Sequence, residues 1–267
     1  MSYYLRHTGK NIWHGKFSLF EESGKLRCAV STRQGGVSKE PYNSLNLAFH
    51  VGDDAQNVIE NRRLFAWSLD VDAKKIVSPE QVHGDNVVRV TKSHAGRGAV
   101  DYESAIKATD ALITNEINLP IMLCFADCVP VLFFDEEHGA IGIAHAGREG
   151  TKLHIVQKTL RAMMTKFGTE PAKCMAAVAP SIGGCCYEVS EDAARGFDEG
   201  CIIRRDGKIY LDLPKENFRQ LVELGVKKEF IEQANVCTAD ENNWYFSYRA
   251  DNRTTGRIAV LMMLNGE

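Results

Sequence analysis

The sequence contains no long run of Lys or Arg, and its 267 residues carry a formal net charge of −3. This composition predicts neither a nucleic-acid partner nor a membrane-surface partner. No repeat, low-complexity tract or Pro/Ser-rich linker divides the chain. We therefore expect a single domain over residues 1–267, while the sequence leaves the oligomeric state open.

Targeting and membrane-spanning segments are also missing. The first residues, MSYYLRHTGKNIWHGKF, lack the apolar core of a signal peptide, which predicts a cytoplasmic protein with reduced thiols. The most apolar stretch, LPIMLCFADCVPVLFF at 119–134, is too short to cross a bilayer and is interrupted by Asp127. It predicts buried strands instead. The eight cysteines are then expected to be thiols or metal ligands, and Cys128 is available for chemistry.

Common catalytic motifs are absent as well. The chain has neither a Walker loop nor a His-Glu-x-x-His motif. GRGAVD at 96–101 lacks the third glycine of a dinucleotide-binding turn, and APSIG at 179–183 has Ala where a nucleophile elbow has Gly. Both segments predict tight turns, with Ser181 as a minor candidate nucleophile. With eight histidines and no His-x-His pair, the chain could hardly fill the several copper sites of a multicopper oxidase.

Strand and helix patterns are mixed throughout, which predicts an α/β fold. Helices with caps or an apolar face are expected at 53–69, 150–168 and 214–225. The second of these is expected to bury one face that carries Leu153, Val156, Leu160, Met163 and Phe167. Strands are expected within 26–36, in two short pieces of 75–90, on both sides of a turn within 121–145, within 173–184 and at 256–264.

Three chemically active side chains share one context, an apolar strand that ends in small residues. They are His83 in EQVHGDN, Cys128 in FADCVPV and His145 in GIAHAGREG. Strand ends that open into glycine turns often carry binding sites. One thiolate and two imidazoles can hold Zn²⁺ and leave a fourth position for water. The alternatives are a structural cysteine with two hydrogen-bonded histidines, a Cys128–His145 nucleophile pair without metal, and a His₂Cys copper site.

Asp127, beside Cys128, could orient a ligand histidine or stabilise a nearby backbone turn, and both alternatives stay open. The adjacent pair Cys185–Cys186 is interpreted as a packing feature. The remaining histidines are expected at the surface or in helix caps, at positions 7, 14, 50, 94, 138 and 154.

Eight motifs occur in one order between residues 31 and 257. They are STRQGGVSKEPYNSLNLAFHVGDD, NR at 61–62, QVHG, TDALITN, ADCVPVLFFD, HAGREGT, APSIGGCCYEV, and FSYRADN followed by GR. Together they closely resemble the YfiH/laccase-domain family, whose members have been described as polyphenol oxidases and as purine nucleoside phosphorylases. The resemblance covers nearly the whole chain.

The resemblance implies an α-β-β-α sandwich similar to certain cysteine hydrolases, with Zn²⁺ held by His83, Cys128 and His145 and Cu²⁺ as an alternative occupant. It implies phosphorolysis of adenosine, inosine and methylthioadenosine by phosphate. Adenosine deamination is also implied, with zinc-activated water attacking C6 of adenine. The alternatives are a cysteine or metal hydrolase that edits peptidoglycan precursors carrying a wrong amino acid, a copper-dependent polyphenol oxidase, and a non-enzymatic metal-binding protein.

Catalysis is assigned through the resemblance to the three ligands, with Asp127 as a candidate orienting group. A phosphate ion needs a cationic site, which Arg side chains form well. Charge and motif position indicate the following candidates for binding substrate and phosphate: Arg33, Asn46, Arg62, Arg148 and Arg249.

The chain departs from the family pattern near the expected anion site. Arg148 and Glu149 stand where relatives have Trp and Arg, and Ala250 replaces the second Arg of Ser-Tyr-Arg-Arg-Asp. Glu149 is expected just before a helix that starts near Thr151. It would repel phosphate if it faced the pocket, or cap the helix if it faced solvent. We expect weaker phosphorolysis than in relatives, with deamination less affected.

Overall fold

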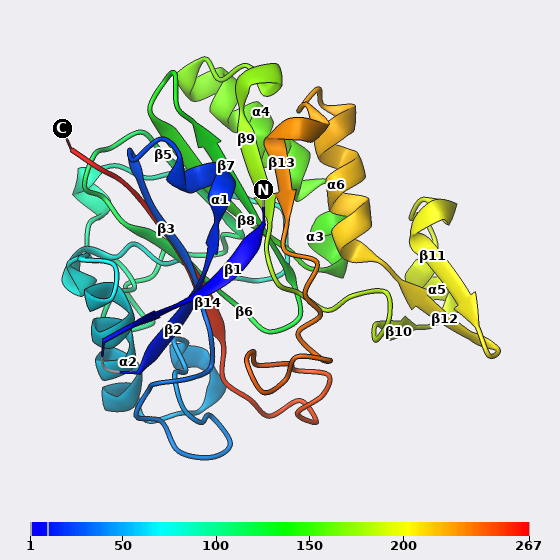
Figure 1. Cartoon of the computed structure of the whole chain (residues 1–267), viewed down its shortest axis with the longest axis horizontal. Coiled ribbons are helices and arrows are strands. Elements are labelled where there is room, and N and C mark those ends of the chain that lie inside the picture. Colours follow the sequence, from blue (N-terminus) through cyan, green and yellow to red (C-terminus); the bar gives the residue numbers. More distant parts are fainter. Residues whose placement is uncertain (1, 10, 267) are drawn as a thin grey trace.

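The computed structural model describes residues 2–9 and 11–266, within which two large β-sheets pack face to face (Figure 1). The first sheet is antiparallel throughout and contains, in spatial order, β1 (Tyr3–Thr8), β2 (Ile12–Phe17), β3 (Leu26–Ser31), β14 (Ile258–Leu264) and β6 (Ile121–Phe125). The second is mixed and contains β13 (Ile231–Gln233), β9 (Met175–Val178), β7 (Val129–Asp135), β8 (Ala140–Ala146), β5 (Ala111–Thr114) and β4 (Val87–Arg89).

A small sheet and several helices surround these two sheets. The small sheet lies beyond α6 at the side of the molecule and contains β10 (Glu188–Val189), β12 (Lys208–Leu211) and β11 (Ile202–Arg205) (Figure 1). The helices are α1 (Ser18–Glu21), α2 (Ala55–Trp67), α3 (Arg148–Lys152), α4 (Ile155–Phe167), α5 (Glu191–Ala194) and α6 (Leu213–Glu223). Single 3₁₀ turns occupy Phe49–Val51, Ala73–Lys75, Lys92–His94, Pro171–Lys173, Glu199–Cys201 and Lys228–Phe230. Among the residues described, no helix has the length and apolar character needed to cross a bilayer.

Strand β14 shows why the molecule is layered. Successive side chains of a strand point to opposite faces. Ile258, Val260 and Met262 therefore join the core between the two sheets, while Ala259 and Leu261 pack on the other side among residues of α2. Because both faces are buried, the strand is apolar at every position.

The second sheet is covered in the same way. Leu132 of β7 lies in the core between the sheets, whereas Phe133 packs on the opposite face with Leu160 of α4 and Leu221 of α6. The order of layers is thus α2, first sheet, second sheet, and α4 with α6. The α-β-β-α arrangement predicted from the family resemblance is confirmed.

The apolar stretch 119–134 forms β6 and β7, which belong to different sheets. The chain crosses from one sheet to the other through residues 126–128. Cys128 therefore does not lie inside a strand but at the point where two buried layers meet. Strand β8 resumes after the turn at 135–139, as expected.

The first and third expected helices are confirmed as α2 and α6. The Asp54 side chain caps α2 by accepting from the backbone N–H of Gln56, and Asp212 caps α6. The expectation of one helix over 150–168 is wrong. His154 has a φ of 60°, in the left-handed region, which ends α3 and starts α4 as a separate helix. Leu153, placed at this break, is 44% exposed and not on the buried face.

Segment 75–90 also differs from expectation. Only its second half forms a strand, β4, while Val77 and Pro79 make isolated bridges to Ile121 and Ile106. The loop between them is therefore free to form the turn that carries His83.

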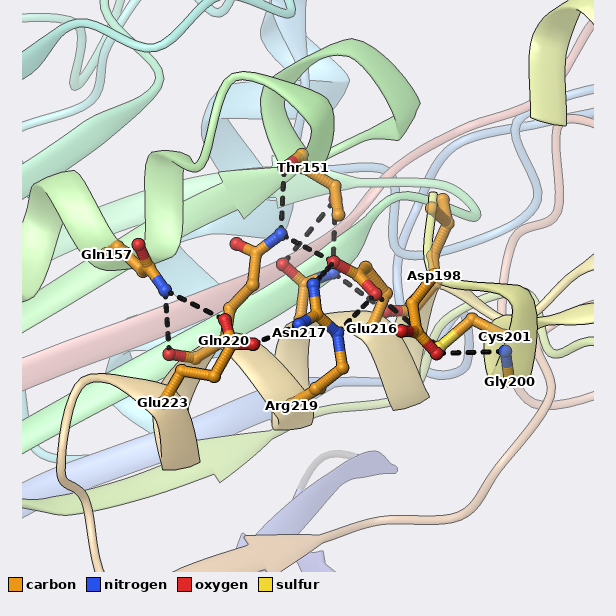
Figure 2. A network of polar contacts seen from close by, with 11 residues as sticks. Thr151, Gln157, Asp198, Gly200, Cys201, Glu216, Asn217, Arg219, Gln220 and Glu223 are labelled. Carbon is orange, nitrogen blue, oxygen red and sulfur yellow. Dashed lines mark hydrogen bonds and ion pairs between the residues drawn. The ribbon is translucent and has the colours of Figure 1, made fainter. Parts of the chain in front are cut away.

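Buried polar side chains fasten α6 to α3 (Figure 2). Asn217 Nδ2 donates to Thr151 Oγ1 at 3.1 Å, and Gln220 Nε2 donates to the Thr151 carbonyl at 3.0 Å. Gln220 Nε2 also donates to Glu216 Oε1 at 3.0 Å. Because α3 follows β8 after a single residue, this network sets the direction of the chain immediately beyond His145.

Candidate metal centre and adjoining cavity

His83, Cys128 and His145 converge from three separate parts of the chain. His83 lies in the turn before β4, Cys128 in the crossing between the sheets, and His145 near the end of β8. One ligand atom from each lies within 4.8 Å of the others, and the two imidazole centroids are 4.9 Å apart. Ligand atoms around a tetrahedral Zn²⁺ lie roughly 3.3–3.8 Å apart. Small side-chain shifts would therefore bring this set to coordination distance.

Asp110, directly before β5, holds two of the three ligands in place. Its Oδ1 accepts from His145 Nδ1 at 2.8 Å and from the backbone N–H of His83 at 3.0 Å. Its Oδ2 accepts from the backbone N–H groups of Val82 at 3.2 Å and Gly84 at 2.7 Å. The carboxylate is fully buried. Because Nδ1 of His145 bonds to Asp110, Nε2 remains for a metal, as in carboxylate–histidine–metal arrangements.

Sequence reasoning missed Asp110. A signal was present, since a carboxylate stands immediately before the buried strand in TDALITN. Asp127 was the candidate for this role, but its side chain makes other bonds. It accepts from Thr238 Oγ1 and from the backbone N–H of Arg249, both at 2.7 Å. Of the two open alternatives, the structure shows Asp127 stabilising neighbouring turns, while Asp110 orients His145.

The two most buried ligands strongly perturb each other. Burial alone would raise the pKa of Cys128, but the charge and hydrogen bonds of His145, with a smaller part from His83, lower the pKa to about 6. Burial alone would lower the pKa of His145. The negative charges and hydrogen bonds of Cys128 and Asp110 outweigh burial and raise the pKa of His145 to about 9. The pair thus favours a thiolate, the form that binds metals and also the form that attacks as a nucleophile.

Gly147 allows the ligands to come together. A Cβ atom at this position would lie 2.9 Å from Cys128 Sγ and 3.3 Å from His83 Cδ2. Its φ of −69° is accessible to any residue, so the requirement for glycine comes from this close approach and not from backbone conformation.

A cavity of about 750 Å³ opens next to the three ligands. This volume lies in the usual range of small-molecule sites. Its wall combines cationic and aromatic groups with two carboxylates, from Arg148, Arg249, Arg253, Arg257, Phe125, Tyr187, Tyr248, Asp127 and Glu149. The excess of arginine over carboxylate suits an anionic ligand.

Two of the five residues predicted to bind substrate, Arg148 and Arg249, line this cavity. The other three do not, because their polar groups bond elsewhere. Arg62 is buried and donates to the Leu47 carbonyl at 2.8 Å. Asn46 and Arg33 bond within their own loops, and Arg33 also pairs with Asp251 at 3.5 Å.

Sequence reasoning missed Arg253 and Arg257 as cavity residues. Arg257 had a signal, as the last residue of the GR motif. The expectation of a surface or capping position is wrong for His14, which is buried. His50 is exposed, as expected, but it also lines the cavity, where desolvation lowers its pKa to about 4.

Glu149 lines the cavity and forms an ion pair with Arg148, Oε1 to a guanidinium nitrogen, at 2.7 Å. The helix begins at Arg148 and not near Thr151, because Gly147 is its N-cap. Glu149 therefore lies inside the first helical turn. An acidic side chain in the first turn is favourable to the helix, and the ion pair also offsets the charge of one cavity arginine.

Similarity to known proteins identifies the family. A sequence profile described as "Multi-copper polyphenol oxidoreductase laccase" matches residues 27–265. The chain belongs to this family. The predicted resemblance to the YfiH/laccase-domain family is thereby confirmed.

Relatives of this laccase-domain protein include "Purine nucleoside phosphorylase YlmD" of Bacillus subtilis, 36% identical over 245 residues that cover 89% of this chain and 88% of that protein. The protein of the same name from Geobacillus stearothermophilus is 38% identical over 260 residues, covering 91% and 95%.

Two solved structures share the fold. The crystal structure of YlmD from Geobacillus stearothermophilus matches with a TM-score of 0.92 at 33% identity, covering 98% of this chain and 99% of that one. The hypothetical protein YfiH of Bacillus licheniformis matches with a TM-score of 0.91 at 34% identity, covering 97% and 98%.

Proposed function

We propose that this laccase-domain protein is a zinc-dependent purine nucleoside phosphorylase that also deaminates adenosine. The proposed substrates are adenosine, inosine and methylthioadenosine. The observation that carries the proposal is the His83–Cys128–His145 set at the edge of an arginine-lined cavity. Relatives named purine nucleoside phosphorylase, which align with about nine-tenths of the chain, support the substrate class.

The donor set fits Zn²⁺. A thiolate and two imidazoles are ligands that zinc prefers, and a three-ligand set leaves one coordination position for substrate or water. Asp110 supplies the outer carboxylate that such sites use to fix a histidine. When bound, Zn²⁺ would polarise an oxygen atom of substrate or water as a Lewis acid.

The residues of the chain would do the remaining work. In phosphorolysis, a phosphate oxygen replaces the purine at C1′ of the ribose, so the phosphate must lie beside the sugar. Arg148 and Arg249 would hold it, and their position in the cavity wall supports this role. The rings of Tyr187 and Tyr248 offer apolar faces for the purine, and Arg249 lies over the Tyr187 ring at 5.1 Å.

The test is product analysis with zinc-loaded protein. We expect adenosine and inosine to release adenine and hypoxanthine together with ribose 1-phosphate, at rates that rise with phosphate concentration. Ammonia from adenosine should form without phosphate. Metal-free protein that hydrolyses an amide of a peptidoglycan precursor, with no nucleoside cleavage in the zinc form, would favour the cysteine hydrolase. Rapid phenol oxidation by protein loaded with several copper ions would favour the oxidase.

Glu149 is predicted to weaken phosphate binding. Glu149→Arg and Glu149→Gln should lower the KM for phosphate about two- to fivefold, because an exposed ion pair is worth up to about 1 kcal/mol and its loss frees Arg148. Adenosine deamination should change less. The measurement is a phosphate titration on inosine, with Glu229→Gln as a control on the exposed surface. An unchanged KM for phosphate, with only thermal stability altered, would show that Glu149 serves the helix alone.

A further inference from the structure

A second group of metal-binding side chains lies in two loops beside the cavity. Cys185 and Cys186 are in the loop between β9 and β10, and Cys237 and Asp240 follow β13. One ligand atom from each of the four lies within 4.8 Å of all the others. None of the four lines the cavity, and the chemistry proposed above uses none of them. The interpretation of Cys185–Cys186 as a packing pair is also wrong, because Cys185 is exposed.

Hydrogen bonds join two of the three cysteines in this cluster to Asp240. Cys185 Sγ donates to Asp240 Oδ2 and Cys186 Sγ to Asp240 Oδ1, each at 3.0 Å. Cys237 Sγ accepts from the backbone N–H of Gly183 at 3.3 Å. Two thiols thus share one carboxylate, while the third sulfur accepts a hydrogen bond from a backbone N–H.

Gly183 leaves room for the cluster. A Cβ atom there would lie 3.1 Å from Cys185 Sγ and 3.8 Å from Cys237 Sγ. The contact with Cys185 is tighter than an ordinary van der Waals contact, so a larger residue would push the loop carrying Cys185 away from Cys237. The missing side chain of Gly183 therefore leaves space for Cys185 Sγ and Cys237 Sγ to lie close together.

We propose that Cys185, Cys186, Cys237 and Asp240 form a structural Zn²⁺ site, distinct from the centre at His83, Cys128 and His145. Sulfur atoms around tetrahedral zinc are about 3.8 Å apart, so the cluster needs only a modest contraction. Structural zinc sites use four protein ligands, whereas catalytic sites keep one coordination position open. The cluster of Cys185, Cys186, Cys237 and Asp240 offers four ligands, and the other group offers three. Zinc binding would release one proton from each coordinating thiol to solvent.

The second site would fasten two parts of the cavity wall. Ile182 and Tyr187, which line the cavity, flank the segment that carries Cys185 and Cys186. On the other loop, Thr238 follows Cys237 and donates to Asp127 at 2.7 Å. A bound ion would hold both segments together next to Cys128 without touching substrate.

Metal analysis tests the proposal. Zinc per chain would be measured by mass spectrometry in the parent, His83→Ala, Cys237→Ser and the double variant, after purification in excess zinc and desalting. We expect each single variant to lose about one equivalent and the double variant to lose both. Cys201→Ser, which changes a cysteine outside both groups, should retain the parental content. Loss of all bound zinc in folded His83→Ala would overturn the proposal.

Absorption spectroscopy with Co²⁺ in place of zinc provides a second test that does not require the Cys237→Ser variant to fold. His83→Ala leaves the second cluster intact, so adding Co²⁺ should produce thiolate-to-cobalt charge-transfer bands of the strength expected for three sulfur ligands. These bands should weaken in His83→Ala/Cys186→Ser. Bands that are absent, or unchanged by the second substitution, would contradict the assignment.

Alkylation separates a zinc site from a disulfide. With iodoacetamide and peptide mass spectrometry, the three cysteines of zinc-loaded protein should react slowly and become reactive after a chelator is added. Cysteines that become reactive only after a reductant would indicate a disulfide and overturn the zinc site. Rapid alkylation with zinc still present would overturn it as well.

Discussion

Replacing Cys128 by Ala is expected to lower kcat/KM for inosine phosphorolysis by at least about 10³-fold, since a Lewis-acid metal supplies several kcal/mol and each 1.36 kcal/mol is a factor of ten. The thiolate is the only anionic member of the set, and Gly147 lies against its Sγ. Removal of the Cys128 thiolate should therefore abolish zinc binding at this site as well as the activity. Both would be measured on the same preparation, by steady-state kinetics and by metal analysis.

His83→Ala separates the metal mechanism from a cysteine nucleophile. It removes a ligand but leaves Cys128 beside His145 and Asp110. A zinc enzyme should lose as much activity in His83→Ala as in Cys128→Ala. A nucleophile activated by His145 should retain most of its activity in His83→Ala even without metal. His7→Ala, an exposed histidine in β1, is the matched control and should behave like the parent.

Asp110→Ala is expected to reduce the free energy of unfolding by about 3–5 kcal/mol, the usual effect of removing one partner from a buried charged network. The carboxylate accepts three backbone N–H groups from the turn at 82–84 in addition to His145 Nδ1. Without it, the three backbone donors of this partly buried turn lose their acceptor, and His145 loses its partner in the buried interior. Urea unfolding followed by circular dichroism would give the difference.

Asp110→Asn tests the role toward the metal more directly. An amide keeps the shape but offers one acceptor oxygen in place of two, so zinc affinity should fall about 10–100-fold, as for other outer-shell partners. Asp127→Asn is the matched control. Its carboxylate bonds to Thr238 and Arg249, so the zinc affinity should stay near the parental value. An equal loss of zinc affinity in both variants, or no loss in Asp110→Asn, would show that Asp110 does not support the metal site.

The sequence alone determined the features that depend on local pattern. An apolar residue at every position of 258–264 indicates a strand buried on both faces, and Asp54 before α2 indicates a helix start. The three candidate ligands were also readable, because His83 and His145 each precede a turn that contains glycine and Cys128 interrupts the most apolar stretch of the chain. The order of the motifs between residues 31 and 257 was sufficient to indicate the family and its layers.

Only the tertiary structure decided how these pieces meet. Asp110 and His145 are 35 residues apart, and no spacing rule predicts their hydrogen bond. The assignment of β6 and β7 to different sheets depends on β14, which joins β6 from more than a hundred residues away in the chain. Periodicity reports which face of a strand is buried, but not which strand lies beside it.

The same reason explains the cavity and the second cluster. Arg62 and Arg249 were both candidates for binding substrate, yet the Arg62 guanidinium donates to the Leu47 carbonyl while Arg249 lines the cavity. Cys186 and Cys237 lie on loops that approach only because β9 and β13 are parallel neighbours in the second sheet. The sequence gives the chemical type of each side chain directly. Which side chains become neighbours in a site depends on strand pairing between distant parts of the chain.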